Sequence, residues 1–275
     1  MFVRQHGTAG PPVIVIHGGP AAVGDVAPVA RELSAAFCTF EPWQRGSGSE
    51  PLTVASHVAD LRELVREVTA SSDLQPALVG HSWGGMLALC FAAAHPTECG
   101  PVALIGCRTF DTAARRSLEE VRDRRLDASQ RETLVQINRL ADPVKRMMQR
   151  HHLQRQVYDY CPAEPYPEKE EFEPFDLKAH NETWADMTRL IEDRTYPRAF
   201  DAILTPVAMF HGNFDPHPGQ LIRDSLLPHI PGLEYREFKN CGHSPWIEKY
   251  ARAHFFLSLS QWLGTYTSRS ANALE

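Results

Sequence analysis

A serine, an aspartate and a histidine of this chain stand in the order and surroundings of an acyl-transfer site. Ser82 lies in Gly80-His81-Ser82-Trp83-Gly84, which matches the pattern G-x-S-x-G. In that pattern a sharp turn from a strand into a helix lifts the serine hydroxyl above the edge of a sheet, and the glycines avoid clashes that a Cβ would cause. A short apolar run precedes the motif and a longer one follows it. The pattern therefore predicts Ser82 as a nucleophile.

The base and the acid that such a serine needs follow later in the chain. His243 lies between the last predicted strand and the terminal helix. Asp215 follows the penultimate predicted strand and suits the acid that orients the imidazole. The alternative for this aspartate is an Asx turn before the next proline. His211 also lies at that strand end, but its Gly-Asn context favours a structural turn. We therefore predict Ser82, Asp215 and His243 as a catalytic triad.

An oxyanion hole requires two convergent backbone N–H donors. One is expected from Trp83, the residue after the nucleophile, and the other from His17-Gly18-Gly19-Pro20, most simply from Gly19. The alternative for this second stretch is a plain Gly-Pro turn after a strand. The side chain of Trp83 is the candidate substrate-binding residue. The alternative there is that the indole packs beneath the segments that cover the site.

These residues need a sheet whose strands end at one edge. Pro12–His17 is a β-branched run without alternation, which indicates a strand buried on both faces of a parallel sheet. Apolar residues recur every three or four positions from Val54 to Val68 and predict an amphipathic helix, while Met86–Ala94 is apolar all round and predicts a buried one. Further strands are expected at Phe2–His6 (antiparallel), Phe37–Phe40, Ala77–Val79, Pro101–Gly106, Pro206–Phe210 and Leu233–Phe238, and further helices at Gln220–Leu227 and Trp246–Leu263, with a frayed tail over Ser268–Glu275.

The middle of the chain has a different character. From about residue 110 to residue 197 the charge rises and the strand signals end, and helices are expected at Arg115–Arg139 and Asn181–Glu192. We expect an interrupted core over 1–109 and 198–275 and a helical cap over 110–197. Such a cap would close the site and select the substrate.

Composition excludes several classes of protein. The 275 residues carry 28 Lys+Arg against 34 Asp+Glu, a formal net charge of −6. Nucleic-acid binding needs a basic patch, so no nucleic-acid partner is expected. No apolar run approaches the roughly 18 residues of a membrane span, and the first residues lack the features of a signal peptide. We therefore expect no membrane partner and a cytoplasmic location.

The cysteines and histidines show no metal-ligand spacing, and the predicted chemistry needs no metal or organic cofactor.

In this order of motifs the chain resembles the α/β-hydrolase superfamily, and more narrowly its proline iminopeptidase-like branch. The carrying residues are His17-Gly18-Gly19-Pro20, Gln44-Arg45-Gly46-Ser47-Gly48-Ser49 and Ser82-Trp83-Gly84. The resemblance implies an α/β-hydrolase fold, a mostly parallel sheet flanked by helices, with a helical cap inserted after the sixth-strand position. Because few residues precede the first buried strand, we expect at most one of the antiparallel strands that often begin this fold. The resemblance also implies that Arg45 anchors a loop near the site.

This chain departs from the branch in several places. Ala21 stands where members usually have glycine, His81 where they often have glycine, and Trp43 where they have aspartate. Members recognise the free amine of the substrate with acidic cap residues. This cap offers seven acidic residues, none of which matches a family position: Glu164, Glu168, Glu170, Glu171, Glu173, Asp176 and Glu182. The alternative is that this acidic run is a solvated loop.

The residues therefore predict a serine hydrolase that cleaves a small ester or amide, on a small-molecule or short-peptide substrate, through an acyl-enzyme. An aminopeptidase of the proline iminopeptidase type is one form of it. An esterase or lactonase with the same triad and a carbon–carbon hydrolase are alternatives. A non-catalytic ligand-binding protein on the same scaffold is the alternative from another class.

Overall fold

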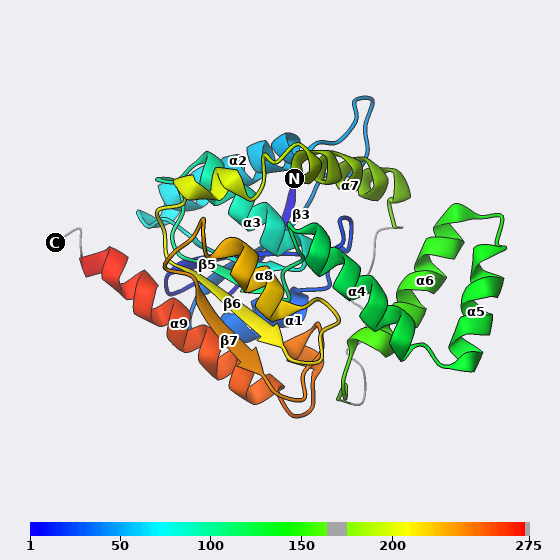
Figure 1. Cartoon of the computed structure of the whole chain (residues 1–275). Helices are drawn as coiled ribbons and strands as arrows, with labels where there is room; N and C mark the ends of the chain where they lie inside the picture. Colours follow the sequence, from blue (N-terminus) through cyan, green and yellow to red (C-terminus); the bar gives the residue numbers. More distant parts are fainter. Residues whose placement is uncertain (164–174, 273–275) are drawn as a thin grey trace.

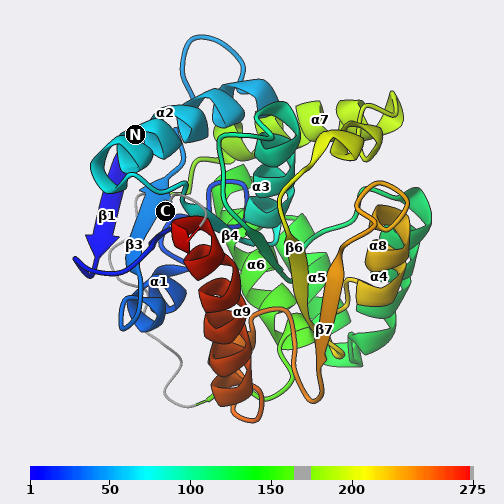
Figure 2. The same cartoon turned by 90° about the vertical axis from the view of Figure 1, so that its left-hand side faces the viewer.

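The computed structural model describes residues 1–163 and 175–272. Its centre is a seven-stranded sheet in the order β1-β3-β2-β4-β5-β6-β7 (Figures 1 and 2). Only β1 runs antiparallel to its neighbour, as expected. The strands are β1 (Phe2–His6), β2 (Pro12–Ile16), β3 (Cys38–Trp43), β4 (Ala77–His81), β5 (Val102–Ile105), β6 (Val207–Gly212) and β7 (Glu234–Phe238). This is the predicted mostly parallel sheet.

The central strands are buried on both faces, and their side chains alternate between two cores. Ile14 and Leu78 belong to a core that includes residues of α2 (Val54–Ser72), α3 (Trp83–Ala94) and α8 (Gly219–Leu226). Val13 and Val79 face the opposite core, with α1 (Ala27–Leu33) and α9 (Arg252–Asn272). Figure 2 shows α9 lying across one face of the sheet, with α3 behind the strands. The continuous apolar runs therefore mark strands covered by helices on both sides.

Among the described residues, four α-helices lie between β5 and the short 3₁₀ helix (Arg198–Ala202) that precedes β6: α4 (Thr112–Arg125), α5 (Ala128–Asn138), α6 (Pro143–Tyr158) and α7 (Leu177–Glu192). We call them the inserted helices. The single helix predicted at Arg115–Arg139 was wrong, because Asp127 begins a new helix with a capping box to Gln130. Helix α6 was not predicted, since polar residues occupy most of its turns. In Figure 1, α5 and α6 lie farthest from the sheet, and α7 lies near α2.

The end of the chain also differs from the prediction. Ser244 and Pro245 open a short 3₁₀ turn at Pro245–Ile247 instead of the terminal helix, which begins only at Arg252. The chain stays extended at Glu248 because it pairs there with Pro162 in an isolated antiparallel bridge. Helix α9 then continues to Asn272, so part of the predicted frayed tail is helical. Among the described helices, none combines the length and the apolar character that a membrane crossing needs.

Candidate active site

Ser82 occupies the turn between β4 and α3, with φ 52° and ψ −113°, a conformation that L-residues rarely adopt. The flanking glycines make this turn possible. A Cβ on Gly80 would lie 2.3 Å from the carbonyl oxygen of Gly84, and one on Gly84 would lie 2.3 Å from that of Ile16. The Ser82 N–H donates to the carbonyl of Ile105 at 2.9 Å, which ties the turn to the end of β5. The serine thus stands in the strained strand-to-helix turn that the motif predicts.

The two predicted oxyanion donors come from different elements. Gly19 follows β2 in a left-handed conformation with φ +114°, and a Cβ there would lie 2.6 Å from the N atom of Ala22. Trp83 is the first residue of α3. Within the described residues, neither amide donates a hydrogen bond to another group. Both N–H groups are therefore available to a ligand.

The side chain of Trp83 is fully buried. Its Nε1 donates to the Oε1 of Gln44 at 2.8 Å, and its ring packs edge-on against His57 and Trp184. Gln44 also donates from its Nε2 to the carbonyl of His17 at 2.9 Å. The burial fits the alternative that the indole packs under the inserted helices. The hydrogen bonds of Gln44 to Trp83 and His17 hold the Gln44 loop against the end of β2.

The predicted acid and base are in direct contact. His243 Nδ1 lies 2.7 Å from Asp215 Oδ2, and both residues are largely buried. Gly106 makes room for the imidazole, because a Cβ on this glycine would lie 2.9 Å from His243 Nδ1. Ser82 and His243 therefore both pack against the end of β5. The Ser82 hydroxyl makes no hydrogen bond among the described residues. Such contacts often form fully only when substrate is bound.

Asp215 has more partners than a triad acid needs. Its Oδ1 accepts from the backbone N–H of His217 at 2.9 Å and lies 2.7 Å from His217 Nδ1. His211 Nε2 lies 3.4 Å from Oδ2 and donates to the carbonyl of His217 at 2.9 Å. The bond to His217 N–H forms the Asx turn, and the contact with His243 is the one that a triad acid makes. Asp215 therefore has the contacts of both alternatives. The sequence did not predict His217 as a site residue, because no motif around it distinguishes it from the other loop residues.

Burial and charge set the protonation of this group. Burial lowers the pKa of His243, and the charge of Asp215 offsets only part of that effect. Burial acts to raise the pKa of Asp215, but the three surrounding imidazoles outweigh it and hold this pKa well below its usual value. Burial also lowers the pKa of His217 to about 3. At neutral pH the carboxylate is therefore ionised, and the imidazole of His243 is neutral and able to accept a proton.

Asp215, His217 and His243 each have a ligand atom within 4.8 Å of the others, a grouping that some metal sites share. Both imidazole Nδ1 atoms lie at hydrogen-bond distance from the carboxylate oxygens. An ionised carboxylate only accepts hydrogen bonds, so both Nδ1 atoms must carry protons. The two Nδ1 atoms therefore serve hydrogen bonds to the carboxylate, and each neutral imidazole has its lone pair on Nε2.

His81, which departs from the usual glycine before the nucleophile, braces the base. Its Nε2 lies 3.3 Å from the carbonyl oxygen of His243, and its Nδ1 lies 3.3 Å from Oδ2 of Asp25. The His81 ring also packs edge-on against Trp246. The substitution therefore adds a contact that helps to position the loop of His243.

A second connection joins that loop to the end of α6. Glu248 is fully buried, and its carboxylate accepts hydrogen bonds of 2.7 Å from the backbone N–H groups of Tyr160, Cys161 and Gly242. The N–H of His243 donates to the carbonyl of Tyr158 at 3.1 Å. The inserted helices and the loop of the base are therefore linked through backbone groups.

Two of the acidic residues weighed for amine recognition have structural partners. Asp176 caps α7 through Ala179 N–H and accepts from Ser47 N–H at 2.7 Å. Glu182 accepts from Leu52 N–H at 3.0 Å. The other five, Glu164, Glu168, Glu170, Glu171 and Glu173, lie outside the described residues. The two carboxylates hold α7 on the loop that precedes α2. In that loop Arg45 forms an ion pair with Asp60 of α2.

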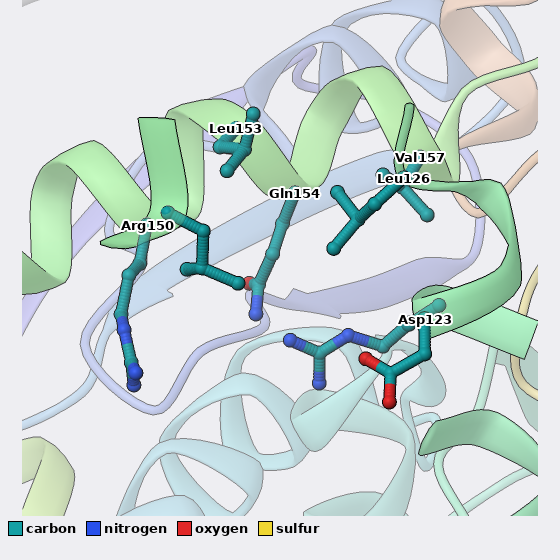
Figure 3. Close-up of a pocket in the computed structure, with 8 residues that line it drawn as sticks. Asp123, Leu126, Arg150, Leu153, Gln154 and Val157 are labelled. Atoms are coloured by element: carbon teal, nitrogen blue, oxygen red, sulfur yellow. The ribbon is translucent and has the colours of Figure 1, made fainter. Parts of the chain in front are cut away.

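A pocket lies among the inserted helices α4, α5 and α6 (Figure 3). Its labelled lining residues are Asp123, Leu126, Arg150, Leu153, Gln154 and Val157. None of the residues that line it belongs to the predicted site. The pocket is therefore distinct from the group around Asp215.

The sheet order, the strained serine turn and the Asp215–His243 contact together define an α/β hydrolase. Residues 11–250 match the model of the α/β hydrolase fold family. The chain belongs to this family and is a hydrolase.

The relatives found by comparison include esterases and a peptidase. A stretch of 108 residues is 34% identical to the pimeloyl-[acyl-carrier protein] methyl ester esterase of Chromobacterium violaceum, and it spans 38% of this chain and 40% of that enzyme. Among solved structures, VinJ superposes with a TM-score of 0.71 at 20% identity, covering 96% of this chain and 94% of VinJ. Proline iminopeptidase of Mycobacterium smegmatis superposes with a TM-score of 0.64 at 18% identity, covering 96% and 94%. A thermophilic esterase from Thermogutta terrifontis gives 0.63 at 21%, covering 97% and 93%. The iminopeptidase is thus one of several similar structures, and the narrower branch is not singled out.

Proposed function

We propose that the chain is a serine hydrolase that cleaves an ester through an acyl-enzyme on Ser82, Asp215 and His243. The observation that carries the proposal is the buried Asp215–His243 contact at 2.7 Å. The strained turn of Ser82, packed against the same strand end, supports the nucleophile role. Together these features match the parts that a triad requires.

In the proposed reaction His243 Nε2 takes the hydroxyl proton of Ser82 while Oγ attacks the ester carbonyl carbon. The amides of Gly19 and Trp83 stabilise the oxyanion. Asp215 keeps the Nδ1 tautomer and balances the imidazolium charge. The tetrahedral intermediate then collapses, and the alcohol leaves with the proton from His243. Water repeats the same steps on the acyl-enzyme and releases the acid.

Two observations favour an ester over the amide of a free-amine substrate. Asp176 and Glu182, the two described acids considered for amine recognition, already accept hydrogen bonds from backbone N–H groups. A relative that is 34% identical over 108 residues is a methyl ester esterase. We also propose that residues 110–197 act as the cap over a core of 1–109 and 198–275. Hydrogen bonds from the core N–H groups of Leu52 and Val54 to α7, and from Tyr160 to the core residue Glu248, support the seating of this cap on the core.

Labelling with a fluorophosphonate probe tests the proposal. We expect the native protein to be labelled, Ser82→Ala to lose labelling, and Ser129→Ala, an exposed serine of α5, to keep it. Lack of labelling in the folded native protein would favour a non-catalytic binding protein. Turnover of a p-nitrophenyl ester without turnover of a proline anilide supports the esterase form. The reverse preference would replace it with the aminopeptidase form.

A further inference from the structure

Arg108 is a cation next to the proposed site that the mechanism does not use. It follows β5 by three residues and lies two positions after Gly106, where an added Cβ would lie 2.7 Å from the carbonyl oxygen of His243. The residue is partly buried, and no carboxylate among the described residues pairs with it. Burial lowers the pKa of its guanidinium, although the group stays charged at neutral pH. A guanidinium that is partly withdrawn from water and has no carboxylate partner loses hydration without gaining an ion pair, so its position needs a reason.

The surroundings of Arg108 connect it to both parts of the predicted oxyanion hole. Its guanidinium carbon lies 4.2 Å from the ring centre of Trp184 on α7. That ring packs edge-on against Trp83, the residue after the nucleophile, with centroids 6.5 Å apart. One turn earlier on α7, His180 Nδ1 bonds to the carbonyl of Pro20 at 3.0 Å. His180 and Trp184 are on one face of this helix. Arg108 therefore lies where α7 meets the nucleophile turn and the loop of Gly19.

Two more arginines increase the positive charge on this side. Arg125 stacks 3.6 Å above the ring of Phe214, the neighbour of Asp215, and Arg122 lies 5.9 Å from the ring centre of Tyr158. The Tyr158 ring in turn lies 5.3 Å from that of His243. Neither arginine pairs with a carboxylate among the described residues. The charge of Asp215 acts on both Arg108 and Arg125, but the oxygens of this carboxylate already serve two imidazoles.

We propose that Arg108 forms an anion-binding subsite of the hydrolase, and that the substrate is an ester carrying a carboxylate. This inference rests on the function proposed above. The planar guanidinium can match a carboxylate with two parallel N–H donors, and its contact with the Trp184 ring restrains the side chain. Arg122 and Arg125 add attraction for an anion without needing to touch it. The shared chemistry is a carboxylate in either the acyl or the alcohol part of the ester.

Matched esters test the subsite. For the acyl part, the p-nitrophenyl monoester of adipic acid is compared with p-nitrophenyl hexanoate. For the alcohol part, 4-(hexanoyloxy)benzoate is compared with its methyl ester. We expect Arg108→Gln to lower kcat/KM for the anionic ester of one pair by about 10- to 100-fold, the range of a lost hydrogen bond to a charged group. The neutral ester of the same pair should change little, and Arg108→Lys should fall between because it keeps the charge but not the fork.

The control is Arg124→Gln, which removes an exposed arginine of α4 and should leave both pairs unchanged. Equal loss on anionic and neutral esters, together with a lower Tm, would show that Arg108 only packs under α7 and would overturn the subsite. No selective loss in either pair would do the same.

Binding to an inactive protein separates this inference from the proposed reaction. Ser82→Ala is titrated calorimetrically with monomethyl adipate and with dimethyl adipate. We expect the monoester to bind about tenfold or more tightly than the diester, and the preference to vanish in Ser82→Ala/Arg108→Gln. This result would stand even if Ser82 proved not to be the nucleophile. Equal binding of both esters would refute the subsite while leaving the triad proposal intact.

Discussion

His217 and His243 share one carboxylate. Their ring centroids lie 4.6 Å apart with an angle of 28° between the planes, and each Nδ1 lies 2.7 Å from a different oxygen of Asp215. The acid therefore divides its negative charge between the proposed base and a second, neutral imidazole. Because His217 competes for that charge, it limits how strongly Asp215 stabilises a protonated His243.

We predict that His217→Phe shifts the pH profile of kcat/KM. Loss of the Nδ1–H donor leaves more of the Asp215 charge for His243, so the pKa of His243 rises and the acidic limb of the profile moves to higher pH. His217→Asn is the matched control, since its amide N–H takes the place of Nδ1–H and should restore the original limb. An unchanged limb in His217→Phe, with normal folding, would assign His217 a packing role only.

Removal of the acid or the base should abolish most of the activity. We expect His243→Ala and Asp215→Asn each to lower kcat by at least about 10³-fold on an ester substrate. Asparagine keeps the shape of the acid but no longer enforces the Nδ1–H tautomer. The measurement is steady-state turnover, with circular dichroism to check folding. A near-normal rate in Asp215→Asn would move the acid role to another residue.

The stability of the fold should depend on His57. This residue is buried, its Nε2 bonds to Thr183 Oγ1 at 2.8 Å, and burial lowers its pKa from 6.5 to about 4. Between these two values the unfolded chain binds a proton that the folded chain does not. The free energy of unfolding therefore falls as pH drops from 6.5 to 4, by about 3 kcal/mol for this residue.

Urea unfolding at several pH values measures that slope. His57→Gln keeps a hydrogen-bonding group but does not titrate, so its slope between pH 6.5 and 4 should be shallower than that of the native protein. His254→Gln, at an exposed position of α9, controls for the replacement itself. Parallel curves for the native protein and His57→Gln would contradict the buried neutral state.

The serine turn should not tolerate a larger residue at Gly84. A Cβ there would lie 2.3 Å from the carbonyl oxygen of Ile16, which belongs to a central strand and has little room to move. We expect Gly84→Ala to lower the free energy of unfolding by about 1–3 kcal/mol and to reduce fluorophosphonate labelling. Gly264→Ala is the contrast, because nothing lies within 4 Å of that Cβ in α9. It should stabilise the protein by about 0.5–1 kcal/mol.

Local patterns predicted what is local in this protein. The G-x-S-x-G motif predicted the serine turn, and the apolar runs predicted the buried strands. Asp215 and His243 each follow a predicted strand, which predicted that both lie at the same edge of the sheet. Helix α6 escaped because its apolar residues are too few to show a period. The start of α9 was predicted too early, because Ser244-Pro245 is a helix-start signal and the pairing of Glu248 with Pro162 is decided by a segment more than 80 residues away.

Side-chain partners across the insertion were beyond sequence reasoning for the same reason. Arg108 and Trp184 are 76 positions apart, and Tyr158 meets His243 across 85, so neither pair leaves a signal in spacing. His217 is close to Asp215 in the chain, but the sequence of a loop does not predict the orientation of a histidine side chain. These contacts depend on how the inserted helices pack, and the sequence patterns did not predict that packing.

The buried carboxylate of Glu248 makes the exit of α6 and the loop of His243 one mechanical unit. Any rigid-body swing of the outer helices that carried Tyr160 and Cys161 with it would pull on the backbone of the residue before the base. Exchange of these helices for those of a homologue would therefore also disturb the loop of His243. A chimaera would have to retain residues 158–163, or else supply its own N–H donors to Glu248, before a new specificity could be read from it.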